Sequence, residues 1–191
     1  MRIRHRLCSL WFLVFFIFGC SSSGTNRAAD DPSSGIVNFI DTKSVVRLRY
    51  PGDWREKHVL FQPKNVILLL QPPERGGLGK LPQTVSVVAQ DATKVVGPSD
   101  LPAMEQRLIE KAKKEIGDFK LVESADTTVA SERARRVIYS GTKLGVRLEV
   151  MNVITTHAGR GYAVAYMADP AMFDEGRPAV DKVVESIEFA P

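Results

Sequence analysis

The stretch YPGDW, residues 50–54, directly follows the alternating run VVRLRY, residues 45–50. In this run Val46, Leu48 and Tyr50 alternate with two arginines. Such alternation is typical of a strand that buries one face, because successive side chains point to opposite sides of a sheet. The sequence therefore predicts a half-buried strand that ends at a sharp corner.

The corner itself is predicted to be structural. Pro51 fixes φ at about −65° and Gly52 tolerates a positive φ, and a type II turn needs this combination. We therefore expect such a turn over Tyr50–Asp53. Trp54 would then fold back over the edge of the core, because burial of an aromatic side chain is strongly favoured. An exposed Trp54 would instead indicate a binding platform.

Other strands follow from similar patterns. Residues 66–71 (VILLLQ) are apolar on both faces, which favours a central strand. Further strands are predicted at residues 85–89, 119–124, 134–140, 146–155 and 162–168. The connections between the last four are short, which implies antiparallel neighbours, because parallel strands need long crossovers.

Two regions carry helical patterns. In residues 101–116, apolar side chains recur every three or four positions, and Ser99 or Asp100 can cap the first turn. Gly117 is placed to end that helix.

The second helical region begins at Asp169-Pro170, and Gly176 and Pro178 are expected to divide it into a short turn and a final helix. The order of strands, helix, strands and helix predicts an α+β fold. We expect one domain, residues 36–191, with a mainly antiparallel sheet flanked by helices.

The N-terminus, residues 1–19, has the features of a lipoprotein signal peptide. Three arginines precede nine consecutive apolar residues, 10–18 (LWFLVFFIF). A bilayer-spanning helix needs about 20 apolar residues, so this run is read as the core of a signal peptide. It leads into IFGC, residues 17–20, which resembles a bacterial lipobox.

Cys20 is therefore the predicted lipid-attachment site; the alternative is an ordinary secretory signal cut near Gly24. Residues 20–35 are predicted to comprise the lipidated cysteine and a flexible, polar tether. Because Ser21 and not Asp follows the cysteine, the outer membrane facing the periplasm is the favoured location in a diderm bacterium. Cys8 lies within the predicted signal peptide, so no disulfide is expected in the domain.

The charge does not favour a nucleic-acid partner. The chain has 26 Lys+Arg and 22 Asp+Glu, but three of the basic residues lie in residues 1–20, which leaves 23 against 22. Nucleic-acid binding needs a concentrated basic surface, so no such partner is expected.

No motif specifies a catalytic, cofactor or metal site. In GGLGK, residues 76–80, the lysine is followed by Leu81 where a phosphate-binding loop has Ser or Thr. Neither G-x-S-x-G nor H-E-x-x-H occurs. A metal site on His58 or His157 stays open as an alternative, although no ligand spacing supports it.

Three arginines, Arg133, Arg135 and Arg136, suggest an anion site. Glu132 beside them and Glu149 on the next predicted strand favour a different interpretation, a charge-balanced sheet surface exposed to solvent.

Four landmarks occur in an order typical of one family. They are YPGDW, VSVV (residues 85–88) before the first helix, GYAVAYMADPAMF (residues 161–173) and VDKVVESIEF (residues 180–189). In this pattern the chain resembles the PsbP-like family. That family includes the extrinsic PsbP proteins of photosystem II, a nuclear-import factor that binds Ran, and bacterial lipoproteins of the DcrB type.

The resemblance implies an α/β/α sandwich and structural roles for particular residues. Tyr50, Pro51, Gly52 and Trp54 match the family's corner, and Phe173 matches the turn before the last helix. Further matches are Tyr162, Tyr166, Ser186 and Phe189.

The resemblance also implies that the domain has no catalytic activity and binds protein partners, although some photosynthetic members influence calcium or manganese. The lipobox and short tether depart from the plastid pattern, which argues against a photosystem role.

The expected function is that of a membrane-anchored envelope lipoprotein, without a cofactor, that binds an unknown envelope protein or helps to assemble a complex. The alternative is a lipoprotein that binds a metal ion or a small ligand.

Overall fold

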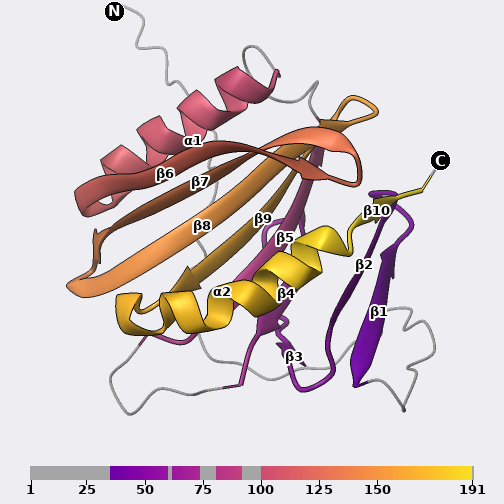
Figure 1. Cartoon of the computed structure of the whole chain (residues 1–191), viewed down its shortest axis with the longest axis horizontal. Helices are drawn as coiled ribbons and strands as arrows, with labels where there is room; N and C mark the ends of the chain where they lie inside the picture. Colours follow the sequence, from indigo (N-terminus) through magenta and orange to yellow (C-terminus); the bar gives the residue numbers. More distant parts are fainter. Residues whose placement is uncertain (1–34, 60–61, 74–80, 92–99, 191) are drawn as a thin grey trace, which may run out of the picture.

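The computed structural model describes residues 35–59, 62–73, 81–91 and 100–190 (Figure 1). Cys20, the predicted signal peptide and GGLGK lie outside this part of the chain. The elements are β1 (Ile36–Asp41), β2 (Val46–Pro51), β3 (Arg55–Glu56), β4 (Val66–Gln71), β5 (Thr84–Asp91), α1 (Leu101–Glu115), β6 (Gly117–Val129), β7 (Glu132–Lys143), β8 (Val146–His157), β9 (Arg160–Ala168), α2 (Pro170–Glu185) and β10 (Glu188–Phe189).

The strands form two antiparallel sheets. The large sheet has the order β3-β4-β5-β9-β8-β7-β6, and the small sheet has the order β1-β2-β10. β6 to β9 follow one another through two-residue turns, so each pairs directly with the next.

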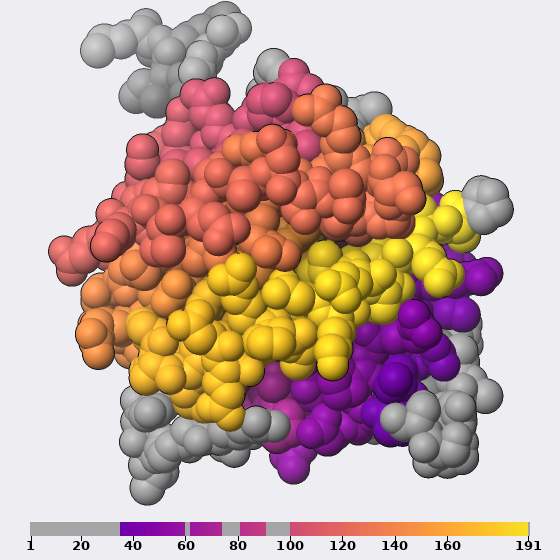
Figure 2. Space-filling model, viewed as in Figure 1, coloured from indigo at the N-terminus to yellow at the C-terminus, as the bar shows by residue number. Residues whose placement is uncertain are grey.

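The two helices cover opposite faces of the large sheet (Figure 1). Ile116, just after α1, packs with Val137 and Leu148 on one face, whereas Val183 of α2 belongs to the core that contains Met151 on the other. The small sheet lies on the same side as α2, and Figure 2 shows α2 as a continuous band between the N-terminal strands and the large sheet. The predicted α/β/α sandwich around a mainly antiparallel sheet is confirmed.

β4 is the strand that was expected to be central, and this expectation is wrong. Among the described strands it lies next to the edge, with only the two-residue β3 beyond it. Leu68, Leu69 and Leu70 are nevertheless all buried. Leu68 and Leu70 share the core with β2, because the small sheet covers that face.

α1 begins at the cap that the sequence indicates. The Asp100 carboxylate accepts a hydrogen bond from the amide of Ala103 at 2.8 Å. The helix ends at Glu115, and Gly117 starts β6.

α2 is one continuous helix, so the predicted division at Gly176 and Pro178 is wrong. Pro178 leaves the carbonyl of Asp174 without its usual intrahelical donor, but both residues are exposed, so water can satisfy that oxygen. Gly176 serves close packing. A Cβ there would lie 3.0 Å from Cζ of Tyr166, and closer still to its hydroxyl and to the side-chain oxygen of Gln83.

Candidate functional site

The YPGDW corner is part of the main core. Val46, Leu48 and Tyr50 are only 1%, 2% and 3% exposed, as their alternation predicts, and Trp54 is 8% exposed. The Tyr50 hydroxyl donates a hydrogen bond to the Glu56 carboxylate. A buried Trp54 does not serve as a binding platform.

The turn at this corner differs from the predicted one. The amide of Trp54 donates to the carbonyl of Pro51 at 3.0 Å, so the turn runs from Pro51 to Trp54, one residue later than expected. Gly52 is not among the glycines with positive φ. Its amide donates to the carbonyl of Gly35 at 2.6 Å, and a Cβ on Gly52 would lie 2.9 Å from that oxygen. Glycine is therefore needed here because another segment of backbone approaches closely.

Phe173 is held inside the sandwich. It is 1% exposed, and its ring stacks on Tyr166 with 5.1 Å between the centroids. The Tyr166 hydroxyl donates to the side-chain oxygen of Gln83 at 3.0 Å, and burial raises the pKa of Tyr166 well above its ordinary value. These contacts seat α2 on β9, which is a structural role.

The C-terminal residues close the same side of the fold. The Arg49 amide donates to the Ser186 hydroxyl oxygen at 2.9 Å, which fixes the end of α2 to β2. The ring of Phe189 stacks on His157 at 4.5 Å and lies 4.7 Å from the ring of Tyr162.

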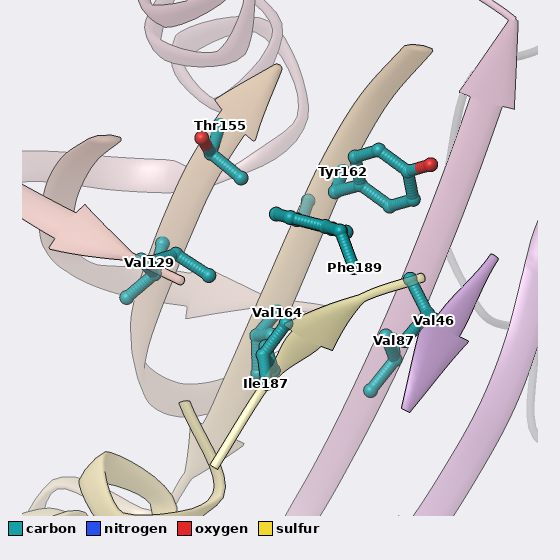
Figure 3. A pocket seen from close by; sticks show the side chains of 10 residues that line it. Val46, Val87, Val129, Thr155, Tyr162, Val164, Ile187 and Phe189 are labelled. Atoms are coloured by element: carbon teal, nitrogen blue, oxygen red, sulfur yellow. The ribbon is translucent and has the colours of Figure 1, made fainter. Parts of the chain in front are cut away.

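A cavity of about 10 Å³ lies beneath this C-terminal segment (Figure 3). Its lining includes Val46, Val87, Tyr162, Ile187 and Phe189, which leaves room for about one water molecule in apolar surroundings. A second cavity, of about 30 Å³, lies near His58 and is also water-sized.

The two histidines of the domain do not form a metal centre with other described residues. His58 is half exposed, with Nε2 4.0 Å from a carboxylate oxygen of Glu56. Nδ1 of His157 lies 2.9 Å from the Glu132 carboxylate, so Glu132 pairs with a histidine and not with the neighbouring arginines. Within the described ranges, no three His, Cys, Asp or Glu side chains gather as metal ligands would. These residues therefore do not fit the calcium or manganese that the family resemblance raises.

The arginine cluster separates onto two faces of β7. Nε of Arg135 lies 2.8 Å from the Glu105 carboxylate of α1, whereas Arg136 reaches Asp181 of α2 at 3.2 Å. Arg133 is exposed. The predicted charge balance is present, but its partners are Glu105 and Asp181 of the helices and Asp126 of β6, which lies 2.9 Å from Arg135, and not Glu132 and Glu149.

The feature that the sequence did not reveal is a set of exposed apolar side chains. The large apolar residues of the described chain that are exposed are Ile36 (41%), Leu121 (42%), Val122 (53%), Leu144 (87%) and Val146 (41%). Four of them lie on β6 or on the β7–β8 hairpin. Leu121 and Val122 are consecutive on β6, and neighbouring exposed apolar side chains are candidates for an interaction site.

None of the described helices is long and apolar enough to cross a membrane. Comparison of the sequence with protein-family models and with curated proteins gives no match.

Solved structures do resemble this fold. The cyanobacterial PsbP (CyanoP) of Synechocystis sp. PCC 6803 has a TM-score of 0.62 at 15% identity, covering 87% of this chain and 99% of its own. PA94 of Pseudomonas aeruginosa, a putative regulator of unknown function, has a TM-score of 0.58 at 15% identity, covering 83% of this chain and 99% of its own. LpqN of Mycobacterium tuberculosis, described as involved in cell envelope biogenesis, has a TM-score of 0.58 at 16% identity, covering 76% of this chain and 83% of its own.

The antiparallel sheet between two helical layers defines the class, an α+β sandwich. Together with these structural likenesses, it shows that the chain has the PsbP-like fold, as the landmark pattern predicts.

Proposed function

We propose that the protein is a lipid-anchored envelope protein, without catalytic activity, whose domain binds a protein partner at the bulge of β6. The observation that carries the proposal is the exposure of Leu121 and Val122, 42% and 53%, where β6 forms the edge of the large sheet.

The geometry of β6 supports a contact with a protein. It spans 13 residues, and among the described strands it pairs only with β7. The register shifts between Leu121 and Glu123, so an extra residue bulges from the strand there. Bulges redirect side chains and interrupt open-ended strand pairing. Lys120 and Glu123 flank the two apolar residues, which favours a specific partner over uncontrolled edge-to-edge association.

The proposed anchor keeps this surface at the membrane. Cys20 follows the apolar signal core, and residues 21–35 can span at most about 50 Å. The proposed envelope setting agrees with the involvement of LpqN, whose fold this chain shares, in cell envelope biogenesis. In a diderm bacterium, Ser21 favours the outer membrane facing the periplasm.

The anchor is tested by Cys20→Ala in cells. The variant should leave the membrane fraction, whereas Cys8→Ala, which changes a residue of the signal peptide, should not. A Cys20→Ala protein that stays with the membrane would contradict the anchor.

The partner surface is tested with a photo-crosslinking amino acid at position 122 in full-length protein in its native cells. The matched control places the same group at Thr128, an exposed position on β6 outside the bulge. We expect a discrete adduct from 122 that is lost with Leu121→Lys and absent from 128. Equal adducts at both positions, or an adduct that survives Leu121→Lys, would contradict the proposal that the β6 bulge binds a protein partner.

A further inference from the structure

The turn of the β7–β8 hairpin carries a residue that the fold does not favour. Leu144 and Gly145 form this two-residue turn, with φ of 50° and 79°. Two positive φ values are typical of a type I′ turn, which strongly prefers Asn, Asp or Gly. A bulky residue is disfavoured there by contacts between its Cβ and the backbone.

The neighbouring hairpins provide an internal comparison. The turn between β6 and β7 is Ala130-Ser131, with φ of 49° and 68°, and that between β8 and β9 is Ala158-Gly159, with φ of 47° and 73°. Both place a small alanine where the third hairpin has Leu144.

Leu144 also gains nothing from burial, because it is 87% exposed. Leu144 is unfavourable both in its backbone conformation and in its exposure to water. Such a residue indicates a role other than stabilising the fold.

The surroundings of Leu144 are basic. Lys143 and Arg147 flank the turn, and Val146 beside it is 41% exposed. Pairing of Gly117 with Thr142 brings the end of α1 and the start of β6 to this end of the sheet. Residues 111–120 and 143–147 together contain six basic and two acidic residues. One of the acidic residues, Glu115, is paired with Lys111 at 3.7 Å.

We infer that this hairpin tip docks on an anionic lipid surface, with Leu144 inserted among the lipid chains. A bilayer presents apolar chains beneath charged headgroups. A protruding leucine flanked by Lys143 and Arg147 matches that arrangement, because long basic side chains reach headgroups while their neighbours insert.

The tip is separate from the β6 bulge. Leu121 faces Tyr139, and Tyr139 faces Val150, which lies four residues along β8 from Val146. Four strand residues span about 13 Å. A domain docked by its hairpin tip therefore leaves the bulge accessible to a protein.

The test measures the depth of the tip in a bilayer. The mature protein carrying Leu144→Trp is isolated from cells with the proposed lipid on Cys20 and reconstituted into vesicles of phosphatidylcholine and phosphatidylglycerol with brominated acyl chains. Trp54 is the other tryptophan of residues 20–191, and its signal, measured in the wild type, is subtracted. The matched control is Ala130→Trp, the equivalent turn position at the opposite end of the sheet (Figure 1).

The tryptophan introduced at position 144 should be quenched at least twofold more than the one introduced at position 130, and this excess should fall when phosphatidylglycerol is omitted. Lys143→Gln with Arg147→Gln should weaken docking about fivefold per charge, since each basic side chain near an anionic surface contributes about a factor of five. Equal quenching at 144 and 130 would show that the tip does not enter the bilayer, and would overturn the inference.

A second variant separates docking from folding. Leu144→Asn suits the turn conformation, so its melting temperature should equal or exceed that of the wild type. A clear decrease would show that Leu144 serves the fold, and would also overturn the inference. Neither result bears on Cys20 or on the crosslink at 122, so this inference can fail while the proposed function stands.

Discussion

Gly176→Ala gives an informative test of the packing because helix propensity and packing predict opposite signs. In the interior of a helix, alanine is favoured over glycine by about 1 kcal/mol. In α2, however, the new Cβ would lie 3.0 Å from Cζ of Tyr166 and closer to its hydroxyl and to the side-chain oxygen of Gln83. Overpacking of this kind typically costs about 1–3 kcal/mol.

The clash also threatens a buried hydrogen bond. The Tyr166 hydroxyl donates to Gln83 at 3.0 Å, and losing this bond would cost about 1 kcal/mol. After subtracting the helix-propensity gain, we expect Gly176→Ala to lower the free energy of unfolding by about 1–3 kcal/mol. In urea this corresponds to a midpoint lower by about 1 M.

A double-mutant cycle with Tyr166→Phe identifies the cause. Removing the hydroxyl removes the nearest obstacle to the new methyl group. The cost of Gly176→Ala should therefore fall by about 1 kcal/mol in the Tyr166→Phe background. A midpoint that rises on Gly176→Ala alone, by the amount that helix propensity predicts, would refute the close approach of α2 to β9.

Three further predictions concern stability and ligands. Trp54→Ala should lower the free energy of unfolding by about 3–5 kcal/mol, because Trp54 lies in the core; unchanged melting with lost partner binding would make it a platform after all. Burial alone would raise the pKa of Glu105, but hydrogen bonds from Arg135 and Ser124 lower it below 4.5. The stabilisation from this carboxylate is therefore present above its unfolded pKa and lost as pH falls through the folded value. Glu105→Gln should be less stable than the wild type at neutral pH, with a difference that shrinks in acid; a constant difference in denaturation across pH would contradict this. Metal analysis of the purified protein should find no stoichiometric ion, and an ion that is lost with His58→Ala or His157→Ala would favour the metal-binding alternative.

Local patterns in the sequence were sufficient to predict most strands and both helical regions, whereas the α/β/α layering was implied by the family resemblance. Alternation identified the buried face of β2, and the apolar spacing with an acidic cap identified α1. The features that the sequence did not reveal depend on contacts between distant residues. Gly52 needs no special φ and is required because Gly35 passes close by, which no local rule can show. Gly176 likewise reads as a helix breaker until Tyr166 is placed beneath it.

The surface was harder to predict than the core. Leu121 and Val122 resemble buried strand residues, and only the bulge and the edge position of β6 expose them. Leu144 did leave a signal, because a leucine before glycine in a two-residue connection is unusual. That signal becomes clear only when the strand ends are known, since the sequence alone places the connection anywhere within residues 141–145.

The proposed anchor and tip depend on each other energetically. One inserted leucine buries much less apolar surface than a myristoyl chain, and a single myristoyl chain already gives only marginal membrane binding. The tip alone would therefore not hold a freely diffusing domain at a membrane. The proposed tether of 15 residues, 21–35, would convert docking into an intramolecular step at an effective concentration in the millimolar range. Its reach of about 50 Å matches or exceeds the width of a domain of this size, so the tip can meet the bilayer wherever β1 begins. The tip would then orient the domain, and Cys20→Ala should release the protein from the membrane even though Leu144 is intact.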